Sequence, residues 1–203
     1  MRRAWPFVGA AAVFAGACLL VNRHHVAGWE RHLTIWFAAA PAWVAHGLWP
    51  VMQFGTLLVS VVVAVVAAMA FGVRRGIVVF ASAFLAWWLS GFVKDIVARD
   101  RPAAFIAGLH VRDHVVGAGF SSGHTAVAFA VATALAPALP RGGRVLAFTL
   151  ASLVGVARMV YGVHFPLDVV GGAAFGIMCG ALVSLLGDAV AHDRRDHAQA
   201  EHG

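Results

Sequence analysis

Long runs of apolar residues, separated by short polar segments, dominate the chain. An α-helix needs about 20 mainly apolar residues to cross the roughly 30 Å hydrocarbon core of a bilayer. Six runs come close to this length or exceed it: Ala4–Val21, Val51–Val73, Gly76–Val97, His124–Leu139, Val145–Val163 and Leu167–Ala191. The pattern therefore predicts an all-α, polytopic membrane protein with six transmembrane helices.

A seventh apolar segment, residues 33–49, differs from the others. It is interrupted by Pro41 and closed by Pro50. It also carries three tryptophans, Trp36, Trp43 and Trp49. Tryptophan is enriched where the bilayer meets water, so we interpret this segment as a helix lying at the membrane interface. We expect this interfacial helix between the first and the second span.

Arginine pairs recur between the predicted spans and fix their orientation. The pairs are Arg2/Arg3, Arg74/Arg75, Arg141/Arg144 and Arg194/Arg195. With six spans and a cytoplasmic N-terminus, all four pairs fall on the inner side, as the positive-inside rule requires. A seventh span through residues 33–49 would put the last three pairs outside. The sequence thus predicts a multi-pass protein of the inner (plasma) membrane with both termini in the cytoplasm.

Composition agrees with this interpretation and excludes other classes. The chain is 61% hydrophobic and 12% charged, with a mean hydropathy of +0.83. A soluble domain has about 25% charged residues, so a water-soluble globule, a disordered chain and a disulfide scaffold are excluded. Membrane orientation explains the net charge of +6 better than nucleic-acid binding. We expect a single membrane domain over residues 1–191 and a polar, disordered cytoplasmic tail over residues 192–203.

A second set of ionisable residues lies away from the inner arginine pairs. Such groups in or beside spans are costly and mark functional sites. Counting helical rise from the inner pairs places Lys94, His124 and Arg158 about 21–28 Å from the inner side. His164 and Asp168 flank the outer turn before the last span. We therefore expect these segments to meet at one outer level. Three further charges stay open as contacts for a lipid head group: Arg99, Arg112 and Asp113.

The cations of this set suit a phosphate ligand. Lys94, Arg101 and Arg158 supply three positive charges, and an arginine fork can contact two phosphate oxygens at once. Ser122 and Gly123 precede a predicted helix, whose free amide groups and dipole form an anion site. Together these groups predict a phosphate-binding site.

The remaining polar residues suit chemistry on that phosphate. His124 and His164 can transfer protons or act as nucleophiles. Asp168 lies four residues after His164 and could hold the Nδ1–H of the imidazole, which leaves the other ring nitrogen free. Cations, amide donors, two histidines and a carboxylate describe phosphoryl transfer without a metal or other cofactor.

Three segments resemble the motifs of the type 2 phosphatidic acid phosphatase (PAP2) superfamily. Lys94–Pro102 matches its K-x6-R-P motif, Ser121–His124 resembles P-S-G-H, and Arg158–Asp168 fits S-R-x5-H-x3-D. The resemblance covers about residues 50–190, and the three motifs together are highly specific. Two positions depart from the pattern, since Ser121 replaces proline and Ala157 replaces serine.

The resemblance implies a role for each motif residue. His164 would be the nucleophile that forms a phosphohistidine, Asp168 would orient it, and His124 would protonate the leaving oxygen and then activate water. The phosphoryl oxygens would be bound by Lys94, Arg101, Ser122, Gly123 and Arg158. The chain would then be a bacterial lipid phosphatase that works on the outer face of the membrane.

The substrate rests on family analogy. Undecaprenyl (polyprenyl) diphosphate is the first expectation, with phosphatidylglycerol phosphate and phosphatidic acid as alternatives. A non-catalytic protein that binds phospholipid head groups would need only the cations, so His124, His164 and Asp168 argue against that class. A transporter would carry its charges near mid-bilayer. Gly176 and Gly180 give a weak signal for a homodimer.

Overall fold

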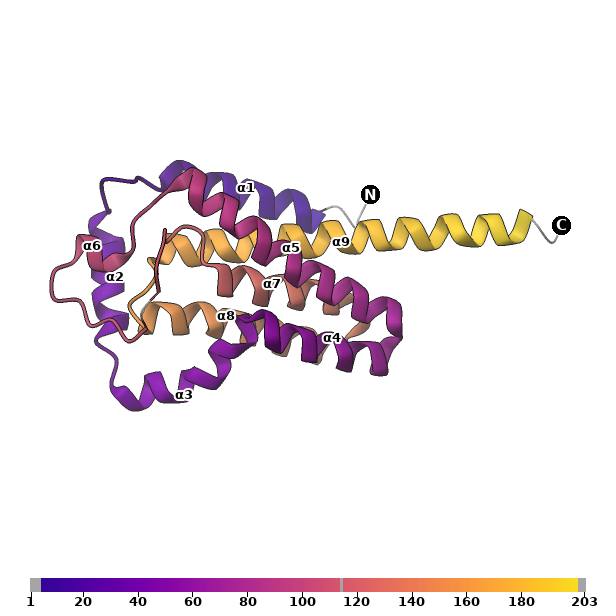
Figure 1. Cartoon of the computed structure of the whole chain (residues 1–203), viewed down its shortest axis with the longest axis horizontal. Coiled ribbons are helices and arrows are strands. Elements are labelled where there is room, and N and C mark those ends of the chain that lie inside the picture. The colour runs from indigo at the N-terminus through magenta and orange to yellow at the C-terminus, as the bar shows by residue number, and fades with distance from the viewer. Residues whose placement is uncertain (1–4, 114, 201–203) are drawn as a thin grey trace.

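A computed structural model describes residues 5–113 and 115–200, with side chains up to Val190 (Figure 1). Its elements are α1 (Trp5–Leu20), α2 (Gly28–Ala38), α3 (Ala42–Met52), η1 (Gln53–Gly55), α4 (Leu57–Phe71), α5 (Val73–Val97), α6 (Pro102–Phe105), α7 (Gly123–Leu135), η2 (Ala136–Ala138), α8 (Arg141–Val160) and α9 (Pro166–Ala200). No strand occurs in these described residues, and the predicted all-α class is confirmed.

Helix α7 lies at the centre of the bundle. It packs against α5, α8 and α9, while α1 lies along α9 and α4 along α5. Most of its side chains are small, and those of Ala126, Ala130 and Ala134 are fully buried. Figure 1 shows α2 crossing one end of the bundle, the end at which α6 also lies. This end is opposite to the tight turn between α4 and α5, and Arg74 and Arg75 lie directly after that turn, at the start of α5.

Glycines let α9 approach α7 closely. A Cβ atom on Gly176 would lie 2.2 Å from the carbonyl oxygen of Ala126. A Cβ atom on Gly180 would lie 2.7 Å from the carbonyl oxygen of Ala130. Both glycines are therefore used for packing inside the chain. Because α7 covers Gly176 and Gly180, these glycines do not support a homodimer, which stays a prediction.

The number of spans is less evident from the helices than from the apolar runs. By length and composition, three helical segments within the described residues can cross a membrane: Val73–Phe105, Arg141–Val160 and Pro166–Val190. Ala42–Gly55 and Leu57–Phe71 would form a fourth span together, although a bend of 64° separates them. Trp5–Leu20 and Gly123–Ala138 are apolar but shorter. Six spans therefore stay a prediction.

The interfacial segment 33–49 is not one helix, as the sequence predicted, but parts of two. Helix α2 ends at Ala38 and α3 begins at Ala42, with Pro41 as its N-cap. The break follows from Pro41, which disfavours helical backbone at the preceding residue. Pro50, expected to end the helix, lies inside α3.

The chain then bends through η1 and divides the second predicted span, Val51–Val73. Val51 is part of α3, and α4 begins only at Leu57. The side chain of Thr56 caps α4 by accepting a hydrogen bond from the Val59 amide at 3.3 Å. The start of the second span is therefore set by this bend.

The C-terminal helix is longer than expected. The predicted tail begins at residue 192, whereas α9 continues without interruption to Ala200 and projects beyond the bundle (Figure 1). Alanine, arginine and glutamine are good helix formers, and extending an existing helix avoids the cost of nucleation. Residues 201–203 of the predicted tail lie outside the described residues.

Candidate active site

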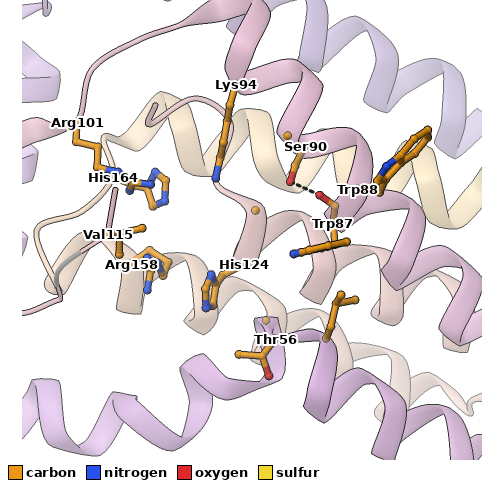
Figure 2. Close-up of a pocket in the computed structure, with 14 residues that line it drawn as sticks. Thr56, Trp87, Trp88, Ser90, Lys94, Arg101, Val115, His124, Arg158 and His164 are labelled. Atoms are coloured by element: carbon orange, nitrogen blue, oxygen red, sulfur yellow. Dashed lines mark hydrogen bonds between the residues drawn. The ribbon is translucent and has the colours of Figure 1, made fainter. Parts of the chain in front are cut away.

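A cavity of about 470 Å³ opens at the end of the bundle near α2 and α6. Its polar lining comes from α5, the segment after α5, the start of α7, the end of α8 and the α8–α9 loop (Figure 2). Six of the predicted site residues line it: Lys94, Arg101, Gly123, His124, Arg158 and His164. Segments that are distant in the sequence thus meet in one cavity, as the sequence predicts.

His164 and Asp168 lie side by side at the base of this cavity. Nδ1 of His164 is 3.4 Å from Oδ2 of Asp168, and both side chains are buried. The pair is not aligned well enough for a hydrogen bond, so Nδ1 has no such partner among the described residues. Catalytic contacts of this kind tighten when substrate binds. The second ring nitrogen of His164 is left for the cavity.

The surroundings of His164 keep its ring neutral. Burial, followed by the positive charges of Arg158, Arg101 and Lys94, holds the pKa of His164 well below its usual range. A neutral imidazole has a free lone pair, which a nucleophile requires. The loop geometry also depends on Gly162, whose φ is +70°. A Cβ atom at Gly162 would lie 2.7 Å from the carbonyl oxygen of His110.

The N-terminus of α7 borders the cavity through Gly123 and His124, whereas Ser122 lies behind them. Ser122 is fully buried and does not line the cavity, although it was predicted as a phosphate ligand. Its amide donates to the carbonyl oxygen of Asp168 at 2.9 Å, and its hydroxyl accepts from Thr125 at 2.9 Å. In this arrangement Ser122 joins α7 to α9, and the anion site is left to the backbone of the first turn.

The three cations are held in different ways. Lys94 points into the cavity (Figure 2) and makes no hydrogen bond or ion pair within residues 5–113 and 115–190. The guanidinium of Arg101 donates to backbone carbonyls, among them those of Gly117 at 2.9 Å and Val163 at 3.0 Å. Nη1 of the buried Arg158 lies 2.9 Å from Oδ2 of Asp113. Lys94 is thus the cation most ready to receive an anion.

Residues 55–190 match the family described as the PAP2 superfamily. This chain belongs to the PAP2 superfamily. The matched region contains every segment that lines the polar part of the cavity, and it agrees with the range expected from the three motifs.

Two relatives share parts of the sequence. A lipid A 1-phosphatase of Porphyromonas gingivalis is 38% identical over 86 residues, which are 40% of this chain and 19% of the relative. A decaprenylphosphoryl-5-phosphoribose phosphatase of Mycobacterium tuberculosis is 32% identical over 114 residues, 56% of this chain and 62% of the relative. The chain therefore spans less than two thirds of either relative.

Two solved structures share the fold. A PAP2-type phosphatidylglycerolphosphate phosphatase from Bacillus subtilis superimposes with a TM-score of 0.77 at 20% identity, covering 92% of this chain and 98% of that protein. LpxE from Aquifex aeolicus superimposes with a TM-score of 0.69 at 24% identity, covering 81% of this chain and 98% of that protein. The chain is an integral membrane protein with the helical fold of these enzymes.

Beyond the PAP2 motifs, the structure adds charged residues that the sequence left open or did not single out. Arg99 is not exposed to a head group but buried between Glu30 and Asp168. Glu30 carries no sequence signal, because it lies in a non-motif segment. Asp113 pairs with Arg158, and Arg112 donates to backbone carbonyls at the α2–α3 junction and the end of α8.

The described residues contain no group of three histidine, cysteine, aspartate or glutamate side chains that could hold a metal ion. Cys18 and Cys179 are free thiols. The groups that this PAP2 cavity does offer are cations, helix amides, two histidines and a carboxylate. Such a set can bind a phosphate and transfer it by way of a histidine.

Proposed function

We propose that this protein is a membrane lipid phosphatase that removes phosphate from a lipid phosphate or diphosphate through a phosphohistidine on His164. The observation that carries the proposal is the meeting of His124 and His164 in one cavity with three cations. Asp168 behind His164 adds the orienting carboxylate that a histidine nucleophile needs.

The geometry supports a two-step reaction. In the first step the free ring nitrogen of His164 attacks the terminal phosphorus, and the bond from phosphorus to the leaving oxygen breaks. This oxygen belongs to the lipid alcohol in a monophosphate and bridges the two phosphates in a diphosphate, and His124 gives it a proton. In the second step His124 takes a proton from water, the water oxygen attacks phosphorus, and the nitrogen–phosphorus bond breaks. Free phosphate leaves and His164 is restored. Lys94, Arg101 and Arg158 stabilise the charge on the transferred group in both steps.

The other wall of the cavity suits an apolar tail. The first residue of α4, Leu57, lines it. Trp87 and Trp88 of α5 line it as well (Figure 2). Both tryptophans are about half exposed on the outside of the bundle, where lipid chains surround a membrane protein. A ligand with a phosphate head and a long hydrocarbon tail can therefore place each part against a matching surface.

Within lipid phosphates we favour undecaprenyl (polyprenyl) diphosphate as the substrate. The Mycobacterium tuberculosis relative is named for a decaprenyl-linked phosphate, which supports a prenyl tail. Phosphatidylglycerol phosphate and phosphatidic acid are the alternatives, and the Bacillus subtilis fold relative is named for the first of them. We further propose that the site faces outward from the plasma membrane, because the arginine pairs favour cytoplasmic termini.

The rival class is a protein that only binds phospholipid head groups. The cations alone would serve that purpose. The pairing of His164 with the buried Asp168, and the presence of His124 across the cavity, favour catalysis instead.

Phosphate release by the detergent-purified protein tests the proposal. The assay contains a chelator and offers undecaprenyl diphosphate, phosphatidylglycerol phosphate and phosphatidic acid in turn. We expect release from at least one lipid and a loss of about 10³-fold or more in His164→Gln. His110→Gln is the matched control, since His110 is exposed and does not line the cavity, and it should keep full activity. A folded wild type that releases no phosphate from any lipid would favour head-group binding instead.

A further inference from the structure

Glu30, Arg99 and Asp168 form a chain of ion pairs behind the cavity. Nη2 of Arg99 lies 2.6 Å from Oε2 of Glu30, and Nη1 of Arg99 lies 3.0 Å from Oδ1 of Asp168. The side chains of all three residues are at most 2% exposed. They come from α2, the loop after α5 and the first turn of α9, so the chain of ion pairs joins three parts of the fold.

We propose that Glu30 is a positioning residue of the active site: it neutralises Arg99, so that Arg99 can fix Asp168 without cancelling the negative charge presented to His164. This role rests on the proposed phosphatase function. Glu30 does not line the cavity and acts on the reaction through Arg99 and Asp168.

Asp168 is held at both of its oxygens. Oδ1 accepts from Arg99 at 3.0 Å, while Oδ2 accepts from the Phe165 amide at 2.9 Å and faces Nδ1 of His164 at 3.4 Å. The guanidinium of Arg99 also lies over the ring of Phe165, 4.4 Å from its centroid. The direction of the carboxylate, and with it the direction of the His164 ring, therefore depends on Arg99.

Arg99 is held in turn by Glu30. Both carboxylate oxygens of Glu30 contact the guanidinium, the second one at 3.2 Å. Oε1 of Glu30 also accepts from the Leu167 amide at 3.2 Å, one residue before Asp168. Glu30 thus anchors both the arginine and the first turn of α9.

The charges of this cluster explain why a second carboxylate is needed. Glu30 and Asp168 carry one negative charge each and Arg99 one positive charge, which leaves a net charge of −1 beside His164. When His164 accepts the phosphoryl group and keeps its Nδ1 proton, its ring becomes positively charged, and a net negative neighbour stabilises it. Without Glu30 the net charge would be zero. In a buried site this difference is felt strongly, because water does not screen it.

Stability alone is a weak reason for such a cluster. Buried ion pairs can often be replaced by apolar side chains without loss of stability. A purely structural Glu30 would lower the amount of folded protein and leave the folded fraction active. A positioning Glu30 would lower the turnover of protein that is folded.

The variant Glu30→Gln separates these roles, because it keeps the shape of the side chain and removes its charge. If the wild type releases phosphate, we expect the kcat of Glu30→Gln to be about ten- to a hundredfold lower, as for other residues that orient a ligating or catalytic group. KM should stay within about threefold, since the phosphate-binding cations are untouched. Asp188→Asn is the control: it removes a carboxylate from the half-exposed Arg74–Asp188 pair, far from the cavity, and should leave kcat unchanged.

The conservative variant Glu30→Asp keeps the negative charge beside Arg99, and with it the net charge of −1, and leaves the contact between Arg99 and Asp168 in place. We expect its kcat to exceed that of Glu30→Gln. Should Glu30→Gln fail to fold, Glu30→Asp is compared with the wild type, and activity within about tenfold supports the proposal.

Three results would overturn the positioning role. They are a folded Glu30→Gln with the kcat of the wild type, a Glu30→Asp no more active than Glu30→Gln, and, where only Glu30→Asp folds, activity near that of His164→Gln. A wild type without phosphate release would instead overturn the proposed function itself, so the two failures are distinguishable.

Discussion

At the scale of single residues, Arg158 shows that a predicted phosphate ligand can already have a partner. Its Nη1 contacts Oδ2 of Asp113 at 2.9 Å, and the same nitrogen lies 3.2 Å from Sδ of Met52. The side chain of Asp113 is about one third exposed, whereas that of Arg158 is buried. A phosphoryl oxygen that approaches Nη1 must therefore share it with a carboxylate of the same sign of charge.

Removal of this carboxylate should strengthen anion binding. In Asp113→Asn the repulsion between Asp113 and phosphate is lost, and Arg158 keeps its charge. We expect inorganic phosphate to inhibit this variant at about three- to tenfold lower concentration, which corresponds to about 0.7–1.4 kcal/mol of binding free energy. The test measures inhibition of phosphate release by added inorganic phosphate. Asp95→Asn, which changes an exposed carboxylate of α5, is the control. Weaker inhibition would mean instead that Asp113 orients Arg158 for the phosphate.

The protonation of His164 gives a second residue-scale prediction. Burial and three nearby cations lower the pKa of this base, so it takes up a proton only in more acidic solution than an ordinary histidine does. We expect a protonation midpoint well below about 6.5, the usual value for histidine. NMR of protein labelled at its histidine rings measures it, with the signal absent from His164→Gln assigned to His164. A midpoint at or above the usual value would contradict the arrangement of charges.

The sequence predicts those site residues that belong to a motif or whose depth can be counted along a helix. Lys94, His124 and Arg158 were predicted at one level from the rise of an α-helix, and they line one cavity. The role of Glu30 could not be predicted from the sequence, because its partner Arg99 is 69 residues away and an ion pair over that distance leaves no periodic pattern. Ser122 fits its motif, yet the direction of its side chain depends on contacts with α9 that spacing does not reveal.

At the scale of elements, the fit of α9 against α7 sets the site, because α7 carries His124 and α9 carries Asp168. The apolar runs predicted both helices, since hydropathy records where a chain is apolar. Hydropathy does not record where a helix axis bends, and so the breaks before Pro41 and after Gly55 were missed. A Cβ atom on Gly55 would lie 2.6 Å from the carbonyl oxygen of His124, so this bend also depends on tertiary contact.

A methyl group between α7 and α9 should therefore loosen the protein. Gly176→Ala places a Cβ atom 2.2 Å from the carbonyl oxygen of Ala126, and backbone has little room to move there. We expect a loss of about 1–3 kcal/mol of stability, typical of an overpacked core, seen as a lower Tm in detergent. Gly16→Ala on α1 meets no atom within 4 Å and should not lower the Tm. Equal melting of both variants would mean that α9 can move away from α7 at little cost.

At the scale of the whole molecule, the two ends of the bundle differ: one carries an arginine pair and the other the cavity. Arg74 and Arg75 mark one end and the cavity opens at the other. From the positive-inside rule we expect the cavity to face the outside of the cell. A lipid phosphate in the outer leaflet would reach the site by lateral movement in the membrane.

Cysteine labelling of intact cells tests this orientation in a Cys18→Ser/Cys179→Ser background. Val116→Cys lies in the loop at the cavity end, where the native side chain is 94% exposed, and a membrane-impermeant maleimide should label it. Gly142→Cys, at the start of α8, has open space around its side chain and should react only after the membrane is permeabilised. The reverse pattern would place the cavity in the cytoplasm.

The buried cluster of Glu30, Arg99 and Asp168 also has a consequence for how the protein is made. The ribosome adds Asp168 138 residues after Glu30, and neither Glu30 nor Arg99 can leave water at low cost before the third member arrives. The cavity end must therefore stay hydrated while the earlier helices are inserted, and it closes only when the final helix enters the membrane. A nascent chain that stops before Pro166 would keep these two charges in water, and its cavity would not yet exist.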